Sequence, residues 1–587
     1  MTDASPVTPG DGPPTDTAAL ATAATDAVAG TGTDADTGGG RRGARLVVTR
    51  STTVLAAVFV LAALVLPNAG VPLSLGAFLR IPVEGLVVVA LLLVLPGTPR
   101  TVLAALFGAV LGVLTVVKIV DFGFYSVLVR PFDLVRDWSL FADGYGFVRD
   151  SFGQLGAVGA ATAAVVLAVG VPVLMTLAAL RLARVVRRHR RPAAGTAGAL
   201  AAAWVVCAVF GAQLVPGAPV AASSAAGLAY GRTLQVRDGL RDRQVFAGEA
   251  AVDAFKEADT DRLLSGLRGK DVIVSFVESY GRSAVEDPEI SPRVDAALAA
   301  GTERLNAAGY ASRSGWLTSP TAGGGSWLAQ ATLLSGLWID NQQRFNDLVT
   351  SDRLTLTSAF KKADWRTVGV MPGITAAWPE GSFYGYDQVY DSRKLGYKGP
   401  SFGWSPMPDQ YTLATFQRAE RGRTDRPPLM AAIPLTSSHA PWVPLPRSVD
   451  WHEVGDGSIY GPMEAAGKNI DDVWPDPHKI RAEYAKSVEY SLDTLVSYVE
   501  KYGDDNLVLV FLGDHQPVPV VTGAGAGRDV PITIVARDPA VLNRIAGWGW
   551  QDGLKPSPQS PVWRMDAFRD RFLTAFGTPG AAARSRH

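Results

Sequence analysis

Long apolar runs crowd the first 220 residues of this 587-residue chain, and they restrict its fold more than any other feature. In hydrocarbon every backbone N–H and C=O must find its partner within the segment, so runs of this kind form helices. Five of them approach the length that crosses about 30 Å of bilayer core. They lie at about 52–70, 82–97, 101–120, 155–180 and 196–216. A membrane domain of five transmembrane helices is therefore predicted over residues 46–217.

Arginines predict how these segments are oriented. Arg41, Arg42, Arg45 and Arg50 directly precede the first run. The loop between the fourth and fifth runs holds six more, namely Arg181, Arg184, Arg187, Arg188, Arg190 and Arg191. Positive charge gathers on the cytoplasmic side, and an odd number of crossings then places everything after about residue 217 outside the cell. Counting the second and third runs as one hairpin-like span would instead leave both ends of the chain on one side.

The remaining composition narrows the possibilities. Residues 1–45 consist largely of Thr, Ala, Gly, Asp and Pro, and such a segment cannot bury enough apolar surface to offset the entropy of ordering. A disordered cytoplasmic tail is expected there, with a second short tail at 576–587. The formal net charge of +0 argues against a nucleic-acid partner. Cys207 is the sole cysteine of the sequence, so no intramolecular disulfide can form.

From residue 271 onwards the pattern changes. Apolar runs of strand length alternate with helical stretches, which predicts an α/β domain over 271–575 with a central, mostly parallel sheet flanked by helices. The expected strands are 271–278, 365–372, 428–436, 507–512 and 530–536, and the expected helices include 292–308, 354–362 and 480–501. An extracellular linker over 218–270, with a helical stretch near 250–267, is expected to join this domain to the membrane domain.

Three of these strands lead directly into groups that bind metals or phosphate. The strand at 271–278 ends in Glu278, the strand at 428–436 leads to His439, and the strand at 507–512 leads to Asp514 and His515. Open α/β sheets place their sites just beyond the carboxyl ends of their strands. Because several reactive groups share that position, one common site is predicted.

A glycine-rich loop offers a nucleophile for this site. In Thr321-Ala-Gly-Gly-Gly-Ser-Trp-Leu328, three glycines precede Ser326, where a helix is expected to begin and to present its positive end to an anion. A free hydroxyl is a poor nucleophile, and metal coordination is one way to activate it. Glu278, Ser326, Asp514 and His515 together provide three oxygens and one nitrogen. This set suits one Mn²⁺ or Mg²⁺ ion, with Zn²⁺ possible.

Six motifs follow one another between about residues 270 and 540. They are Val274-Ser-Phe-Val-Glu-Ser-Tyr280, the Gly-Gly-Ser326 loop, Gly385-Tyr-Asp-Gln-Val-Tyr-Asp391, Thr436-Ser-Ser-His-Ala-Pro441, Tyr484 with Tyr490-Ser-Leu-Asp493, and Gly513-Asp-His-Gln-Pro517. In this order they resemble lipoteichoic acid synthases, which are membrane phosphoglycerol transferases of the alkaline phosphatase and sulfatase superfamily. Five spans before an external domain also match that family's layout.

The resemblance implies roles for individual residues. Glu278, Asp514 and His515 match the family's metal ligands, and Ser326 stands where the family has a threonine nucleophile. His439 matches a histidine that contacts the substrate phosphate.

The expected substrate pocket departs from the family pattern. Trp378 matches a tryptophan of the glycerol phosphate pocket, but Pro372 stands where a second pocket histidine is expected. The run Trp378-Pro-Glu380 also lacks the pocket arginine. Arg282, just beyond Glu278, is a candidate replacement cation. These departures leave the transferred group open.

The resemblance implies a multi-pass protein of the cell membrane with an extracellular catalytic domain. Its expected activity is the metal-dependent transfer of a phospho-alcohol group, such as phosphoglycerol, through a phosphoserine-type intermediate. The expected partners are a membrane phospholipid donor, the bilayer, and a polymer, glycan or lipid acceptor. Two alternatives remain open: a metal-dependent phosphodiesterase or phosphatase of the same superfamily, and a non-catalytic membrane scaffold that retains the fold.

Overall fold

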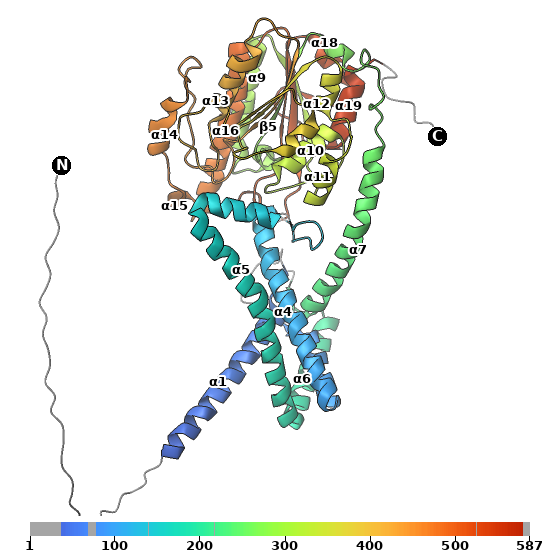
Figure 1. Ribbon diagram of the computed structural model, residues 1–587, viewed down its shortest axis with the longest axis vertical. Coiled ribbons are helices and arrows are strands. Elements are labelled where there is room, and N and C mark those ends of the chain that lie inside the picture. Colours follow the sequence, from blue (N-terminus) through green and yellow to red (C-terminus); the bar gives the residue numbers. More distant parts are fainter. Residues whose placement is uncertain are drawn as a thin grey trace, which may run out of the picture. The chain divides into compact units, whose positions relative to one another are not determined.

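The computed structural model describes residues 37–68, 78–128, 130–138, 140–215, 218–523 and 525–578 (Figure 1). The chain divides into two units, Met1–Leu55 and Ala56–His587, and the first contains the beginning of helix α1 (Thr37–Val65). Most of the tail expected at 1–45 and of the tail expected at 576–587 lies outside the described residues.

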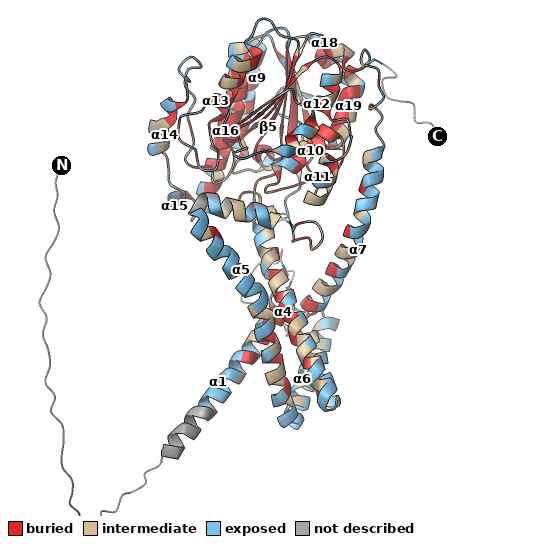
Figure 2. Ribbon diagram, viewed as in Figure 1, coloured by how far each residue is buried: buried red, intermediate tan, exposed pale blue. Residues whose placement is uncertain are grey.

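Four helices among the described residues are long and apolar enough to cross a membrane. The apolar stretches are Val47–Val65 of α1, Gly97–Ser126 of α4 (Gly97–Leu128), Gly153–Arg188 of α5 (Leu140–Arg188), and the whole of α6 (Arg190–Val209). Much of their surface is apolar and exposed (Figure 2), as expected for side chains that face lipid.

The run expected at 82–97 forms a shorter helix, α3 (Val83–Val94), of 12 residues. Pro82 precedes α3 and Pro96 follows it closely, and proline at these positions limits a helix on both sides. The count of five crossing helices therefore stays a prediction.

Helix α3 is nevertheless attached to α6 at its last turn, and the strand before it is attached to the segment that follows α6. Before α3, strand β1 (Ile81–Pro82) pairs with β4 (Ala221–Ala222), which follows α6 in the chain. Near the end of α3, the carbonyl oxygen of Leu93 accepts a hydrogen bond at 2.5 Å from Nη2 of Arg190, the first residue of α6. A second short sheet joins β2 (Gln213–Val215) to β3 (Ala218–Pro219).

Small residues let α4 and α5 pack closely. A Cβ at Gly112 would lie 2.4 Å from Cα of Pro172, and one at Gly108 would lie 2.6 Å from Cα of Thr176. Close approach of this kind is typical of helix pairs in membranes, where van der Waals packing drives association.

The linker differs from its prediction. The helix expected near 250–267 lies earlier, because α7 covers Ser224–Ala251 and is followed by turns up to a short 3-10 helix, η1 (Ser265–Leu267). Val252 is extended, and the side chain of Asp253 then accepts a hydrogen bond at 3.0 Å from the backbone N–H of Phe255. Aspartate in such a turn competes with helix formation, which explains why the helix stops here.

The α/β domain is built on one sheet that is mostly parallel, as expected, with antiparallel pairs towards one edge. Its strand order is β12-β6-β11-β10-β5-β9-β7-β8, with β13 beside β6, and the five neighbours from β10 to β8 are parallel. The strands are β5 (Asp271–Val277), β6 (Ala311–Thr318), β7 (Arg366–Met371), β8 (Gln388–Asp391), β9 (Leu429–Leu435), β10 (Leu507–Gly513), β11 (Asp529–Ala536), β12 (Gln551–Asp552) and β13 (Val562–Arg564).

Helices cover both faces of this sheet (Figure 1). On one side lie α9 (Ser291–Ala307), α13 (Asp409–Phe416) and α16 (Pro477–Tyr502), and on the other lie α10 (Ser326–Ser335), α12 (Leu356–Lys362) and α19 (Ala567–Phe576). Side chains of β5 alternate between the two cores: Ile273 and Val277 enter the first, while Val274 and Phe276 enter the second. A strand buried on both faces explains the continuous apolar run of 271–277.

The remaining helices are short and lie in the connections. They are α8 (Ser283–Glu286), α11 (Gln342–Val349), α14 (Gly461–Ala465), α15 (Ile470–Val473), α17 (Pro519–Thr522) and α18 (Pro539–Asn543).

Candidate metal and nucleophile site

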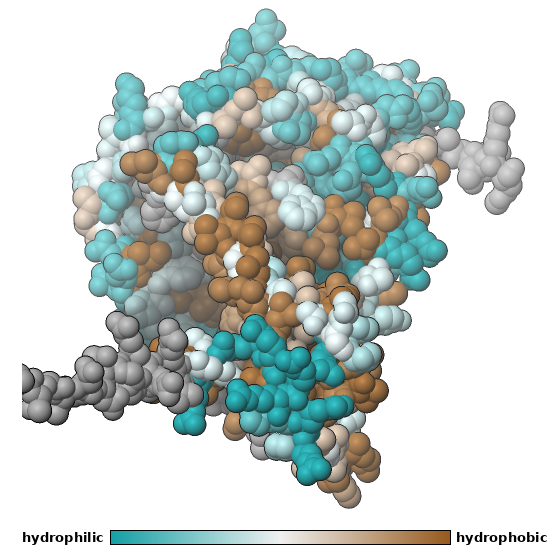
Figure 3. Space-filling view, turned by 60° about the horizontal axis from the view of Figure 1, so that its bottom comes forward, coloured by the Kyte–Doolittle hydropathy of each residue, from teal (hydrophilic) through white to brown (hydrophobic). Residues whose placement is uncertain are grey.

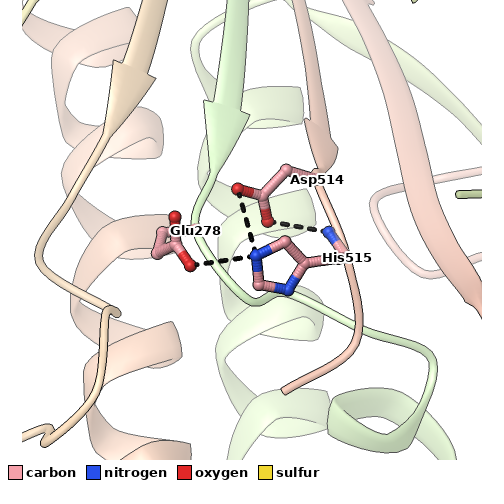
Figure 4. A group of neighbouring side chains, drawn as sticks. All are labelled: Glu278, Asp514 and His515. Atoms are coloured by element: carbon pink, nitrogen blue, oxygen red, sulfur yellow. Dashed lines mark hydrogen bonds and ion pairs between the residues drawn. The ribbon is translucent and has the colours of Figure 1, made fainter. Parts of the chain in front are cut away.

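Glu278, Asp514 and His515 meet at the carboxyl edge of the sheet (Figure 4). They follow β5 and β10, which are adjacent parallel strands with Val277 opposite Gly513. One ligand atom of each residue lies within 4.8 Å of the others, and all three side chains are buried. The structure thus brings Glu278 together with two groups that lie more than 230 residues later in the sequence.

A tight backbone contact makes this convergence possible. A Cβ at Gly513 would lie 1.8 Å from the carbonyl oxygen of Tyr280, so only glycine allows β10 to pass this close. Ser279 has a φ of 55°, a left-handed conformation that is uncommon for a residue with a side chain. Its N–H donates a hydrogen bond at 2.8 Å to Oδ1 of Asp514, and its carbonyl accepts one at 2.7 Å from the hydroxyl of Tyr484. The unusual conformation is therefore held by partners on two other elements.

Ser326 reaches the same cluster from the start of α10. Its Oγ lies 2.8 Å from Oε2 of Glu278 and 3.2 Å from Nε2 of His515. Gly325, with a φ of 81°, caps the helix, and the N–H of Gly323 donates to the carbonyl of Gln516 at 2.8 Å. The glycine-rich loop is thus fastened to the residues that follow β10, and this places the serine beside the acid–histidine cluster.

The tautomer of His515 follows from its surroundings. Nδ1 lies 2.8 Å from the carbonyl oxygen of Gln516, which can only accept, so Nδ1 carries the hydrogen. Nε2 then faces Oε1 of Glu278 at 3.3 Å and Oδ2 of Asp514 at 3.9 Å. An unprotonated ring nitrogen and two carboxylates present lone pairs to one point, and either a proton on Nε2 or a bound cation satisfies them. The donor set of three oxygens and one nitrogen fits a single divalent metal ion.

Crowding of charge in this buried cluster shifts its pKa values. Burial and the neighbouring Glu278 carboxylate both raise the pKa of Asp514. Burial by itself would lower the pKa of His515, but the charges of Asp514 and Glu278 outweigh it and raise that pKa. Burial by itself would raise the pKa of Glu278, but the charge of His515 outweighs it and holds that pKa well below its usual range. Without a metal the cluster therefore favours a protonated His515 between the acids.

His439 lies on a turn after β9 that is attached to this cluster. Oδ1 of the buried Asp409 accepts hydrogen bonds from the N–H groups of Thr436 and Ser437, at 2.8 and 2.9 Å. Ser438 Oγ donates to the carbonyl oxygen of Glu278 at 2.6 Å. This hydrogen bond attaches the segment that carries His439 to the end of β5, where Glu278 lies.

Trp378 and Arg282, two expected substrate-binding residues, are engaged elsewhere in the described structure. Trp378 stacks on Tyr384 with ring centroids 5.7 Å apart. The Arg282 guanidinium pairs with Glu286 at 2.7 Å and Asp529 at 3.1 Å, and lies 4.5 Å from the centroid of a tryptophan ring. The contacts of these two side chains do not include Ser326 or His439, so their substrate roles stay predictions.

Three positioning residues are not among the site residues that the sequence predicts. Asp409, Ser438 and Tyr484 act through hydrogen bonds to backbone groups of distant segments, and no spacing along the chain reveals such contacts. Ser438 and Tyr484 belong to the motifs that carry the resemblance, whereas Asp409 does not.

No protein-family model matches the sequence, and no curated protein matches it. Among solved structures, the chain is similar to the lipoteichoic acid synthase LtaP from Listeria monocytogenes, with 14% identity over 56% of this chain and 77% of that chain and a TM-score of 0.36. It is also similar to the C-terminal periplasmic domain of EcEptC from Escherichia coli, with 13% identity over 53% and 85% and a TM-score of 0.35. A third is the Streptococcus pyogenes phosphoglycerol transferase GacH in complex with sn-glycerol-1-phosphate, with 14% identity over 57% and 90% and a TM-score of 0.33. The first of these bears the name of the family that the motifs resemble.

Proposed function

We propose that the chain is a metal-dependent transferase of the cell surface that moves a phospho-alcohol group from a membrane phospholipid to a polymer, glycan or lipid acceptor. One observation carries the proposal: Ser326 Oγ, at the first position of a helix, lies 2.8 Å from Glu278 and 3.2 Å from His515 in a buried cluster. A hydroxyl in that setting is suited to covalent catalysis on an anionic phosphorus centre.

Glu278, Ser326, Asp514 and His515 would hold one divalent ion, with Mn²⁺ as the first choice and Mg²⁺ or Zn²⁺ as alternatives. When bound, such an ion supplies positive charge that stabilises the serine alkoxide and the phosphate oxygens. The facing lone pairs of Nε2 and the two carboxylates support this assignment.

In the first half-reaction, Ser326 Oγ attacks the phosphorus of the donor, and the bond from phosphorus to the lipid alcohol oxygen breaks. The serine hydroxyl points its hydrogen at Oε2 of Glu278, which is the path for the proton. Backbone N–H groups in the first turn of α10 face the anionic oxygens. His439 stabilises the phosphate or protonates the departing lipid alcohol.

In the second half-reaction, an acceptor hydroxyl attacks the phosphoserine, the bond from phosphorus to Oγ breaks, and Ser326 regains its proton. Water in place of the acceptor would give a phosphodiesterase, the alternative function. Burial of all three acid–histidine groups limits the access of water and favours transfer.

This function requires the α/β domain, 271–575, to face the outer leaflet. We count α3 as a fifth crossing, and the arginines between α5 and α6 then mark the cytoplasmic end. Figure 3 brings that end forward and shows hydrophilic surface there with apolar surface around it. We assign residues 46–217 to the membrane domain and 218–270 to the extracellular linker.

The test is a covalent adduct. The full chain in vesicles containing head-group-labelled phosphatidylglycerol and Mn²⁺ is digested, and the peptide with Ser326 is analysed by mass spectrometry. We expect an added phospho-alcohol mass, label transfer that depends on an acceptor, and loss of both in Ser326→Ala, with Ser351→Ala as a control near the end of α11. Normal turnover by Ser326→Ala would refute the mechanism, and acceptor-independent release of label would favour the phosphodiesterase.

A further inference from the structure

Trp404 stands at the tip of a tight turn beside His439. The turn is closed by two backbone hydrogen bonds, from the N–H of Phe402 to the carbonyl of Ser405 at 2.9 Å and in the reverse direction at 3.0 Å. Gly403 adopts a φ of 59°, which the turn requires. Trp404 itself is 41% exposed.

This turn is docked on the segment that carries His439. Ser405 Oγ lies 2.6 Å from Oγ1 of Thr436, three residues before the histidine. A Cβ at Gly403 would lie 3.1 Å from Cδ of Pro441, two residues after it. The turn therefore contacts the His439 segment both before and after the histidine.

The tryptophan ring stacks directly on the imidazole. The centroids of Trp404 and His439 lie 4.0 Å apart, with the planes at 21°. Gly373 lies close to the indole as well, because a Cβ there would lie 3.3 Å from Cη2 of Trp404. The Nδ1 atom of His439 lies 2.5 Å from the carbonyl of Ala440, so it carries a hydrogen. Stacking fixes the plane of the ring and this hydrogen bond fixes its rotation, which leaves Nε2 to meet a ligand.

We infer that Trp404 is a positioning residue for the reaction, which acts by holding the His439 imidazole so that Nε2 meets the phosphate of the substrate. The inference rests on the proposed function for the identity of the substrate and on the stack for the position of the ring. It also gives Gly373 a role, since a larger side chain there would displace Trp404. The turn at 402–405 thus adds a group from a separate loop to the site.

The kinetic test compares Trp404→Leu with the conservative Trp404→Phe in the full chain in vesicles. Because displacement of a catalytic group by about 1 Å can cost about 100-fold, we expect kcat/KM of Trp404→Leu to fall at least about tenfold. Trp404→Phe, which retains a ring, should stay within about threefold of the wild type. In a His439→Ala background, Trp404→Leu should cause almost no further loss, because both changes remove one function. Additive losses in the double variant would overturn the inference.

A matched control is Trp474→Leu. Trp474 is 37% exposed and stacks on Trp442 at 6.0 Å, close to the same segment but on another ring. Its replacement should leave kcat/KM within about twofold. An equal loss in both variants would mean that any exposed tryptophan matters, and the specific role of Trp404 would be wrong.

A spectroscopic test needs no substrate. The chain has six histidines, so ¹³C-labelled imidazoles of the full chain in nanodiscs give a simple spectrum, assigned with His439→Gln. The His439 C–H resonances should be shifted upfield by the indole ring, and Trp404→Leu should remove that shift while the melting temperature is kept. If the His439 resonances have the same position in wild type and in Trp404→Leu, the stack is refuted. If the wild-type protein shows the upfield shift but is inactive, only the proposed function is refuted.

Discussion

At the residue scale, the site depends on a glycine, Gly513, whose lack of a side chain lets two strands approach each other closely. Gly513 is followed directly by Asp514 and His515, and its α carbon passes so close to Tyr280 that a Cβ would lie 1.8 Å from the carbonyl oxygen. Asp514 in turn binds the N–H of Ser279 at 2.8 Å, which keeps the end of β5 beside the end of β10. The separation of the two strands therefore controls the distance between Glu278 and the other metal-type donors.

We predict that Gly513→Ala separates these strand ends. Overpacking against backbone should lower the free energy of unfolding by about 3 kcal/mol, the upper part of the usual range for inserted methyl groups. Mn²⁺ affinity should fall as well, measured by calorimetry on the folded variant. Gly547→Ala is the control, because a Cβ there meets nothing within 4 Å. Similar melting temperatures of the two variants would contradict the steric account.

At the element scale, a buried ion cluster joins the end of α7 to the last helix, α19. Asp253 accepts two hydrogen bonds from Arg569, both at 3.0 Å, and lies 3.2 Å from Nε of Arg353. All three side chains are almost fully buried. Removing one partner from such a cluster leaves uncompensated charge, which typically costs about 3–5 kcal/mol.

We predict that Asp253→Asn destabilises the domain in a pH-dependent manner. Burial acts to raise the pKa of Asp253, but the charge and hydrogen bonds of Arg569 outweigh it and lower the pKa below 3.8. The stabilisation is therefore complete above the unfolded-state pKa of about 4 and is lost as the pH falls through the folded-state pKa. The gap in melting temperature between wild type and variant should be large at pH 7 and should shrink in acid. Asp259→Asn, at a 77% exposed side chain, should show no such gap.

The strands that the sequence predicts well are those whose own side chains are apolar along the whole strand. Strands β5, β9 and β10 were recognised because both of their faces are apolar. Strand β6 was missed because it carries Arg313 and Ser314, whose polar groups are satisfied only by distant partners: Asp552 at 3.0 Å and Thr533 Oγ1 at 2.8 Å. The metal-type residues were found from the carboxyl ends of strands, whereas Trp404 and Asp409 depend on contacts that arise only after folding.

At the scale of the whole molecule, α7 connects the helical region to the α/β domain by ion pairs rather than by a loose chain. Asp242 of α7 binds Arg344 of α11 at 2.6 Å and Arg136 of the loop after α4 at 3.2 Å. Nearer the start of α7, Arg232 pairs with Asp121 of α4. Both partners of α7 are partly or fully buried at these contacts, so screening by salt is limited. These ion pairs attach α7 to α11 and to the loop after α4 near its middle, and to α4 itself nearer its start.

The orientation of the whole chain depends on whether α3 counts as a crossing, and labelling can decide this. With Cys207, the sole cysteine, replaced by serine, new cysteines are placed at Thr98, in the first turn of α4, and at Asp552, whose side chain is 81% exposed. If α3 crosses, the arginine-rich start of the chain and Thr98 share the cytoplasmic side, and Asp552 lies outside. A membrane-impermeant maleimide should then label Asp552→Cys in intact cells and Thr98→Cys only after permeabilisation. The reverse pattern would mean four crossings, and it would place the Ser326 site in the cytoplasm, where an outer-leaflet donor could not reach it.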